Sequence, residues 1–384
     1  MSRDLKLLSL ALFLWAMGEG LFVFILPIYM AELGASPAQI GQLYAIGAAA
    51  MAVSLVPAGW ATDRFGPKAG LVSGWAIGAV AGFFFIIAND IPVFLIGWLL
   101  YRVTAWVIPA ISAYATRGRG DLPPERALTA VYSMFNAGLI LSPAIGGYLG
   151  KAFGLRANFY VATIMFAVST AVIVLLRHQP PHPPEERARP TELLGNRRFM
   201  GFMLMVFSIM TALYMGYEFA PKFLNDIKHI DVGQIGLMGT AHAAGGFALS
   251  QLLGRRPPRR MLMLAIGLLM IYGVILLQAS WIGWFAVAYF LRGAYAAARS
   301  LINALVARIV PASRLGVAFG VSETVGTAGD IVAPFLAGLL YESTPHAPFW
   351  VMIALCPILI VIVGLFAPRR IEEKQNLAAT FAAD

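Results

Sequence analysis

Long apolar stretches, separated by short polar segments, fill most of the chain. A helix of about 20 residues crosses the ~30 Å hydrocarbon core of a bilayer, and each stretch reaches that length. The pattern therefore predicts membrane-spanning helices along the whole chain. We place twelve of them, at 5–30, 37–61, 67–88, 92–116, 127–150, 156–176, 199–224, 232–253, 258–278, 281–309, 314–341 and 346–367.

The composition supports a multi-pass, all-α membrane protein, because 59% of the residues are hydrophobic and only 12% are charged. Soluble domains carry about twice that charged fraction. The first stretch is too long for the apolar core of a signal peptide, and no small-residue cleavage site follows it, so we expect a retained helix. The single cysteine, Cys356, cannot form an intramolecular disulfide.

The net charge of +9 is unevenly distributed. If the helices alternate in direction, 21 Lys and Arg residues lie on one side and only Lys151, Arg156, Lys222 and Lys228 on the other. The positive-inside rule then places both termini in the cytoplasm. We expect the protein to lie in the inner (cytoplasmic) membrane. We interpret the basic excess as a topology signal with an attraction to anionic lipid, and expect no nucleic acid partner.

The longest polar stretch, 177–198, reads RHQPPHPPEERARPTELLGNRR and divides the predicted helices six and six. Its prolines and charges favour an extended, hydrated segment. We therefore predict an N-terminal six-helix bundle at 1–176, a cytoplasmic linker at 177–198, a C-terminal six-helix bundle at 199–367 and a cytoplasmic tail at 368–384.

An internal repeat relates these two halves. GLILSPAIGG at 138–147 has a partner in GDIVAPFLAG at 329–338, and their prolines, Pro143 and Pro334, are 191 residues apart. Arg102 in the fourth span corresponds to Arg292 in the tenth at an interval of 190. Two similar bundles related by an axis along the membrane normal can rock and expose a midplane site to each side in turn.

Residues 59–68, GWATDRFGPK, lie between the second and third spans. This segment resembles the loop signature of the major facilitator superfamily, G-x-L-A-D-R-x-G-R-K. The matching residues are Gly59, Asp63, Arg64, Gly66 and Lys68, while Thr62 and Pro67 depart from the signature. The resemblance implies that Asp63 faces the positive N-terminus of the eleventh helix when the cytoplasmic side is closed.

The fifth predicted helix resembles the G-x-x-x-G-P-x-x-G-G signature of the proton-coupled exporters of that superfamily. Gly138, Pro143, Gly146 and Gly147 match it, and Ser142 replaces the middle glycine. Small residues permit close helix packing, and the proline permits a bend. A structural kink with no directional meaning is the alternative interpretation. Arg102 matches the arginine of the family's fourth-helix motif, although the residues that follow it do not match.

Ionisable residues inside membrane spans are candidates for function. Glu19 and Arg102 form the predicted pair of the first half, and Asp330 and Glu323 are further candidates for proton coupling, with either Arg292 or Arg299 as partner. A static buried ion pair is the alternative for Glu19 and Arg102. The resemblance implies that the first, fourth, seventh and tenth helices line the transport cavity, and most of these charges lie there.

Helical spacing groups the candidate cavity residues. Residues three or four apart share one face of a helix. The candidate sets are Trp15 and Phe22 on the first helix, Trp98 and Trp106 on the fourth, Tyr214 and Glu218 on the seventh, and Arg292, Tyr295, Arg299 and Asn303 on the tenth.

These observations predict a monomeric secondary transporter that works by alternating access, as a proton-coupled antiporter exporting an amphipathic small molecule or lipid-like compound. An organic-anion transporter or exchanger is the alternative, and a non-transporting membrane sensor is a weaker one. The sequence contains no phosphate-binding glycine loop, catalytic Ser/His/Asp set or Cys/His cluster with metal-ligand spacing, so we expect no enzyme activity, cofactor or metal. The expected partners are the substrate, protons and membrane lipid.

Overall fold

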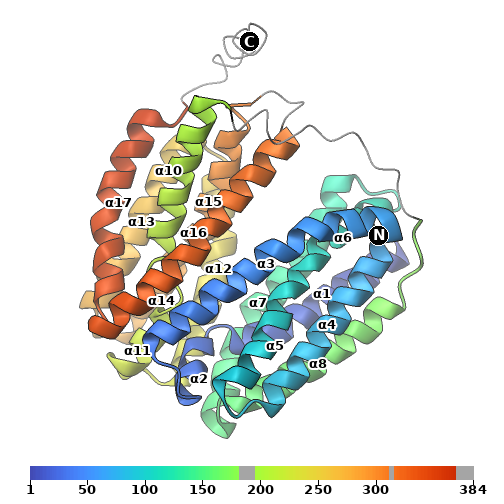
Figure 1. Cartoon of the computed structure of the whole chain (residues 1–384), viewed down its shortest axis with the longest axis horizontal. Helices are drawn as coiled ribbons and strands as arrows, with labels where there is room; N and C mark the ends of the chain where they lie inside the picture. Colours follow the sequence, from blue (N-terminus) through green and yellow to red (C-terminus); the bar gives the residue numbers. More distant parts are fainter. Residues whose placement is uncertain (181–194, 311–314, 369–384) are drawn as a thin grey trace, which may run out of the picture. The chain divides into compact units, whose positions relative to one another are not determined.

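A computed structural model describes residues 1–180, 195–310 and 315–368, and within them the structure is helical (Figure 1). The predicted linker and tail lie mostly outside these ranges. The helices are α1 (Arg3–Phe22), α2 (Leu26–Glu32), α3 (Pro37–Phe65), α4 (Pro67–Ile87), α5 (Ile91–Val103), η1 (Thr104–Trp106), α6 (Val107–Arg117), α7 (Pro124–Phe153), α8 (Arg156–Val174), α10 (Arg197–Tyr214), α11 (Ala220–Asp226), α12 (Val232–Gly254), α13 (Pro258–Gln278), α14 (Ile282–Arg292), α15 (Ala294–Val306), α16 (Leu315–Ser343) and α17 (Ala347–Phe366).

Every predicted span corresponds to helix, but four spans are interrupted. The first divides into α1 and α2, the fourth into α5, η1 and α6, the seventh into α10 and α11, and the tenth into α14 and α15. The pattern of apolar stretches did not indicate these four interruptions. The interrupted spans are the same four that the family resemblance assigns to the cavity. Broken helices at membrane depth expose backbone groups that can serve a site.

Ten helical segments of the described residues are long and apolar enough to cross a membrane. Two predicted spans are not among them. The tenth is divided between α14 and α15, and each piece is shorter than a membrane span. Helix α12 has 23 residues, but its glycines, His242, Gln234 and Gln251 reduce its mean hydropathy.

Two compact units make up the chain, one formed by Met1–Pro184 with Ala220–Ala243 and the other by Glu185–Phe219 with Ala244–Asp384. The segment that contains α11 and the first half of α12 thus groups with the N-terminal residues. The six-and-six division of the chain at the linker stays a prediction.

The helix boundaries repeat along the chain. Helices α4 and α13 begin at Pro67 and Pro258, α5 and α14 at Ile91 and Ile282, and α8 and α17 at Arg156 and Ala347. Each pair has the same interval as Pro143 and Pro334, which lie inside α7 and α16. The repeat found in the sequence is therefore a repeat of helical elements.

Each unit has a core of tightly packed helices (Figure 1). In the first, α1 packs along α7 and α8, and α4 packs between α5 and α8. In the second, α10 packs along α16 and α17, and α13 contacts α14, α15 and α17. The pairs α1–α7 and α10–α16 are equivalent in the repeat.

Candidate functional site

The first unit contains a group that we call the Glu19 cluster, formed by Glu19, Trp15, Tyr101 and Arg102. The Glu19 carboxylate interacts with the side chains of Tyr101 and Trp15 and with the charge of Arg102. The ion pairs found among the described residues do not include one between Glu19 and Arg102. Their interaction is electrostatic, without a direct salt bridge, so the direct pair expected from the sequence is not formed in this structure.

Arg102 has two other contacts. Its guanidinium donates a hydrogen bond to Sδ of Met51 at 3.4 Å and lies 5.4 Å from the ring centroid of Trp98. It belongs to the last turn of α5, immediately before the break at Thr104. A cation in this position stabilises the negative end of the helix dipole.

Three of the four aromatic residues predicted to line a cavity in the first half are core residues here. Trp15, Phe22 and Trp98 are buried, and Trp106 is half-buried. Trp15 stacks on Phe166 with ring centroids 4.4 Å apart, and Trp98 Nε1 donates to the Leu43 carbonyl at 2.8 Å. These contacts fix the helix packing around Glu19, and a role in substrate contact stays a prediction.

The second unit contains the Arg299 cluster, formed by Arg299, Glu323, Asp330, Tyr295 and Asn303. Arg299 donates to Glu323 at 2.8 and 3.1 Å and to Asp330 at 2.8 Å. Asn303 donates to Glu323 at 2.9 Å, and the Tyr295 hydroxyl donates to Asp330. Charge-assisted bonds of this kind are short and directional. Of the two arginines proposed as partners for the acids, Arg299 is the one that binds both.

The two carboxylates differ in their access to solvent. The Asp330 side chain is 12% exposed and that of Glu323 is 45% exposed. A small cavity lined by Arg299, Asn303 and Glu323 adjoins the more open end. The cluster therefore joins a mostly buried acid to a more accessible one through a single guanidinium.

Aromatic rings extend this cluster. The rings of Tyr214, Tyr217 and Tyr295 contact one another with centroids 4.7 to 5.3 Å apart. The Tyr214 hydroxyl donates to Glu218. Arg292 is buried, donates to the Tyr217 carbonyl at 2.7 Å and lies 3.7 Å from the centroid of the Tyr217 ring.

Tyr295, Arg299 and Asn303 belong to one helix, α15, and contact Asp330 and Glu323, whereas Arg292 belongs to α14 and contacts Tyr217. The span breaks at Gly293, which separates Arg292 on α14 from the other three residues on α15. A Cβ at Gly293 would lie 2.2 Å from the backbone nitrogen of Gly246, so the break coincides with a close crossing with α12.

The signature at 138–147 forms the contact between α7 and α1. A Cβ at Gly138 would lie 2.8 Å from the Phe13 carbonyl oxygen, and one at Gly146 would lie 2.1 Å from the Leu21 carbonyl oxygen. Ser142 donates to the Gly138 carbonyl at 2.7 Å and to the Ala16 carbonyl on α1 at 3.2 Å. The serine that departs from the family signature thus adds a hydrogen bond between the two helices.

The opposite side of α7 meets the start of α12, within the same unit. A Cβ at Gly147 would lie 2.8 Å from Cα of Gly236. The Thr240 hydroxyl donates to the Ile140 carbonyl at 2.8 Å and accepts from the Ala144 amide at 3.3 Å. The Ile140 carbonyl and the Ala144 amide are four residues apart, next to Pro143. Thr240 therefore links two backbone groups of α7 at the point where the proline weakens the helical hydrogen bonds.

The turn at 59–68 contains Gly66 at φ 82°, between the end of α3 and the start of α4. This backbone conformation is strained for residues with a Cβ. Arg64 lies 5.2 Å from the ring centroid of Trp60, Lys68 is half-buried and Gly59 belongs to the last two turns of α3. The Asp63 side chain and the residues before α16 lie outside the described part, so the expected contact of Asp63 stays a prediction.

The sequence patterns did not select three residues that make important contacts in the structure. Tyr101 contacts Glu19, Tyr217 contacts Arg292, and Thr240 bridges α7. Tyr101 is next to Arg102 in the sequence, and Tyr217 is next to Glu218. Adjacent residues lie on different faces of a helix, so helical spacing did not select the two tyrosines. Thr240 had only the surrounding glycine-rich run as a signal.

The structure thus defines an all-helical, multi-pass membrane protein with an internal repeat and charged clusters beside broken helices. The sequence profile of the Major Facilitator Superfamily matches residues 8–298 and 219–383, so the chain belongs to this family of transporters. It is a transporter of small molecules and not an enzyme.

Relatives and solved structures agree with this assignment. The chain is 24% identical to Multidrug resistance protein 2 of Bacillus subtilis (strain 168), over 96% of this chain and 95% of that protein. It is 23% identical to Quinolone resistance protein NorA of Staphylococcus aureus (strain MRSA252), over 98% and 100% respectively. A crystal structure of a point mutant of the nucleoside transporter NupG superposes with a TM-score of 0.81 at 14% identity, covering 95% of this chain and all of that one.

Proposed function

We propose that the protein is a proton-coupled antiporter that exports an amphipathic small molecule by alternating access. The Arg299 cluster carries this proposal. One guanidinium faces two carboxylates, so the three groups together have one negative charge in excess when all are ionised. A charge without a counterion is costly inside a membrane.

Either of two species removes this excess charge. A proton neutralises one carboxylate, or a cationic group of the substrate pairs with it. The two cannot satisfy the same carboxylate together, so binding of one favours release of the other. Asp330, mostly buried between Arg299 and Tyr295, is the carboxylate that we assign to this exchange.

The substrate class follows from the rings beside these acids. Tyr214, Tyr217 and Tyr295 form an aromatic surface that fits a flat apolar group bearing a positive charge. The names of the relatives, a multidrug resistance and a quinolone resistance protein, support such a substrate. An organic-anion carrier has less support, because the Arg299 guanidinium is already engaged by two carboxylates.

The proposal also covers the orientation of the chain in the membrane and its oligomeric state. The excess of basic residues on one side supports cytoplasmic termini in the inner membrane. We assign a monomer in contact with lipid as the working unit.

Transport in proteoliposomes tests this function. Purified protein is reconstituted with a pH gradient, acidic on the side that receives substrate, and uptake of ethidium and of a quinolone is followed. We expect accumulation against the substrate gradient and its loss on addition of a protonophore. Accumulation that ignores the protonophore and follows a sodium gradient would refute proton coupling.

The substitution Asp330→Asn locates the coupling site. It removes the carboxylate for which proton and substrate compete but keeps an oxygen that can accept from Tyr295. Proton-driven accumulation should therefore be lost, and the affinity for a cationic substrate should fall. Glu342→Gln, at an exposed position on α16, is the matched control and should behave as the unmodified protein. Equal accumulation by both variants would exclude Asp330 as the coupling residue.

A further inference from the structure

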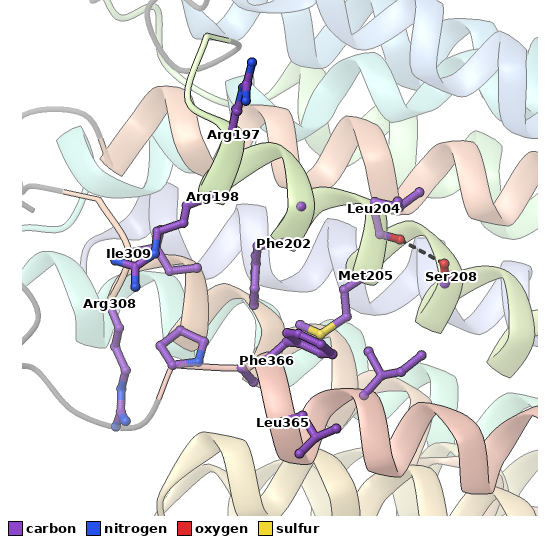
Figure 2. A pocket seen from close by; sticks show the side chains of 14 residues that line it. Arg197, Arg198, Phe202, Leu204, Met205, Ser208, Arg308, Ile309, Leu365 and Phe366 are labelled. Atoms are coloured by element: carbon purple, nitrogen blue, oxygen red, sulfur yellow. Dashed lines mark hydrogen bonds between the residues drawn. The ribbon is translucent and has the colours of Figure 1, made fainter. Parts of the chain in front are cut away.

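The arginines of the second unit differ in how firmly their side chains are held. A cavity of about 670 Å³ lies between the beginning of α10 and the end of α17, and its three arginines, Arg197, Arg198 and Arg308, point in different directions (Figure 2). Arg292, in contrast, is only 2% exposed, and its guanidinium contacts Tyr217 in two ways. These contacts indicate what Arg292 does.

Arg292 contacts both the backbone and the ring of Tyr217. Its Nη2 atom donates to the Tyr217 carbonyl at 2.7 Å, and its Cζ atom lies 3.7 Å from the centroid of the Tyr217 ring. The hydrogen bond holds the backbone from which the ring projects, and the cation attracts the face of the ring. One side chain therefore restrains both the position and the direction of the Tyr217 ring.

The Tyr217 carbonyl requires such a donor because of the local sequence. Residues 215–219 separate the end of α10 from the start of α11. In a continuous helix this carbonyl would accept from the residue four positions later, which is Pro221 and has no N–H. A backbone carbonyl without a donor is costly inside a membrane. Arg292 supplies a donor from another span.

Arg292 also projects from a well-packed position. It is the last residue of α14 and precedes Gly293 at the break in the tenth span. A Cβ at Gly293 would lie 2.2 Å from the backbone nitrogen of Gly246, so this end of α14 packs directly on the backbone of α12. The bond from Arg292 to Tyr217 therefore connects the break in the tenth span to the break in the seventh.

Tyr217 transmits this restraint to the other two rings. Its ring centroid lies 4.7 Å from that of Tyr214 and 5.3 Å from that of Tyr295. Tyr214 and Tyr217 are half-buried, so part of this aromatic surface is accessible to a ligand, whereas Arg292 lies buried beneath it.

We propose that Arg292 is a positioning residue, which holds Tyr217 in the geometry in which the three rings bind a flat cationic substrate. The sequence placed Arg292 among the candidate cavity residues, but here it acts through Tyr217 and not by contact with the substrate. It sets the affinity for substrate and leaves proton exchange to Asp330, which is held by Arg299 and Tyr295. The nature of the ligand rests on the proposed function, whereas the restraint on Tyr217 does not.

Hydrogen exchange tests the restraint without any substrate. Arg292→Met removes the donor and the charge, and Arg260→Met, at an exposed position on α13, is the control. Mass spectrometry follows the peptide that covers residues 215–219 in the full chain in detergent. We expect its exchange to rise about tenfold in Arg292→Met, as for the loss of a hydrogen bond to a charged group, and to stay unchanged in the control.

Two results of this experiment would overturn the proposal. One is unchanged exchange of residues 215–219 in Arg292→Met. The other is an equal rise over all helices of the second unit, which would assign Arg292 a general structural role.

Ethidium binding at constant pH tests the consequence for the substrate. In Arg292→Met we expect the dissociation constant and the KM of uptake to rise about fivefold, as for the loss of one cation–π contact, with the maximal rate of proton-driven uptake retained. Arg292→Lys keeps the charge and a donor and should recover part of the affinity. A lower maximal rate at unchanged KM would contradict positioning. If the unmodified protein did not bind ethidium, the proposed substrate class would be refuted, and the exchange data would still decide whether Arg292 holds Tyr217.

A cycle of variants separates positioning from direct contact. Tyr217→Leu removes the ring and keeps the carbonyl that accepts from Arg292. If Arg292 acts through Tyr217, the double variant Arg292→Met/Tyr217→Leu should bind ethidium no more weakly than Tyr217→Leu alone. Additive losses would show that Arg292 contacts the substrate independently. Tyr217→Leu also covers the case in which Arg292→Met does not fold, since it should weaken ethidium binding by itself, and an unchanged affinity would overturn the proposal.

Discussion

Arg299 and Arg102 were both predicted to pair with acidic residues inside membrane spans, but their neighbours in the structure differ. Arg299 binds Glu323 and Asp330 directly, whereas Arg102 contacts Met51 and Trp98 and influences Glu19 only through its charge. Direct pairing stabilises one arrangement of the second unit. The looser interaction in the first unit leaves Glu19 able to lose its charge without breaking a salt bridge.

This difference makes Glu19→Gln informative. Because Glu19 forms no salt bridge among the described residues, we expect the free energy of unfolding to fall by less than about 1 kcal/mol. If Glu19 carries a proton, downhill exchange should persist and proton-driven accumulation should stop. The measurements are thermal unfolding and both transport modes on one preparation.

The control for Glu19→Gln is Glu32→Gln, at the exposed end of α2 in the same predicted span. It should change neither stability nor transport. A large loss of stability in Glu19→Gln, with both transport modes failing together, would instead assign Glu19 a structural role.

At the scale of elements, glycine positions decide which helices cross closely. Gly138 and Gly146 allow α1 to pack closely against α7. Gly329 on α16 allows α10 to pack closely in the same way, because a Cβ at Gly329 would lie 3.0 Å from the Thr211 amide nitrogen. Gly329 follows Gly138 by the interval of the repeat. Apolar burial contributes little to helix association in membranes, and small residues permit the close backbone packing that contributes to it.

Gly146→Ala should therefore destabilise the protein. The added methyl group meets the backbone of Leu21, which cannot rotate away, and overpacking of this kind costs ~1–3 kcal/mol. Gly267→Ala, inside α13 with no atom within 4 Å of the new Cβ, is the control. It should be neutral or stabilising by up to ~1 kcal/mol. Thermal unfolding in detergent compares the two, and equal midpoints would contradict the role of the α1–α7 crossing.

At the scale of the whole molecule, the proposed mechanism requires elements to separate and close again. The α7–α12 contact is the best-defined candidate, since Lys151 and Asp231 form an ion pair of 3.4 Å beside the Gly147–Gly236 approach. The exposed side chains of this pair contribute little to stability, about 0–1 kcal/mol. They are thus suitable positions for a cross-link that leaves the fold intact.

Locking this contact should stop transport. The double variant Lys151→Cys/Asp231→Cys, treated with a short reducible bifunctional thiol reagent, should lose transport and regain it after reduction. The native Cys356 is buried and should not react. Lys151→Cys alone, treated identically, should remain active. Full transport by the cross-linked protein would show that α7 and α12 need not separate.

The sequence by itself determined the class of the protein. Apolar stretches of membrane-spanning length, the interval between Pro143 and Pro334, and the match at 59–68 and 138–147 specify the spans, the repeat and the family. These properties are local or periodic, so they can be read along the chain. The common face of Tyr295, Arg299 and Asn303 was predictable for the same reason, because it depends on one uninterrupted helix.

Only the tertiary structure decided which residues contact one another across helices. Which arginine binds Asp330, where the four spans break, and how Thr240 bridges α7 all depend on residues far apart in sequence. Gly293 lies at the break and close to the backbone of α12, and the sequence of the tenth span does not show which helix crosses there. The cavity lined by residues of both α10 and α17 likewise exists because two helix ends meet in space, since the distance between side chains on different helices is set by packing and not by spacing along the chain.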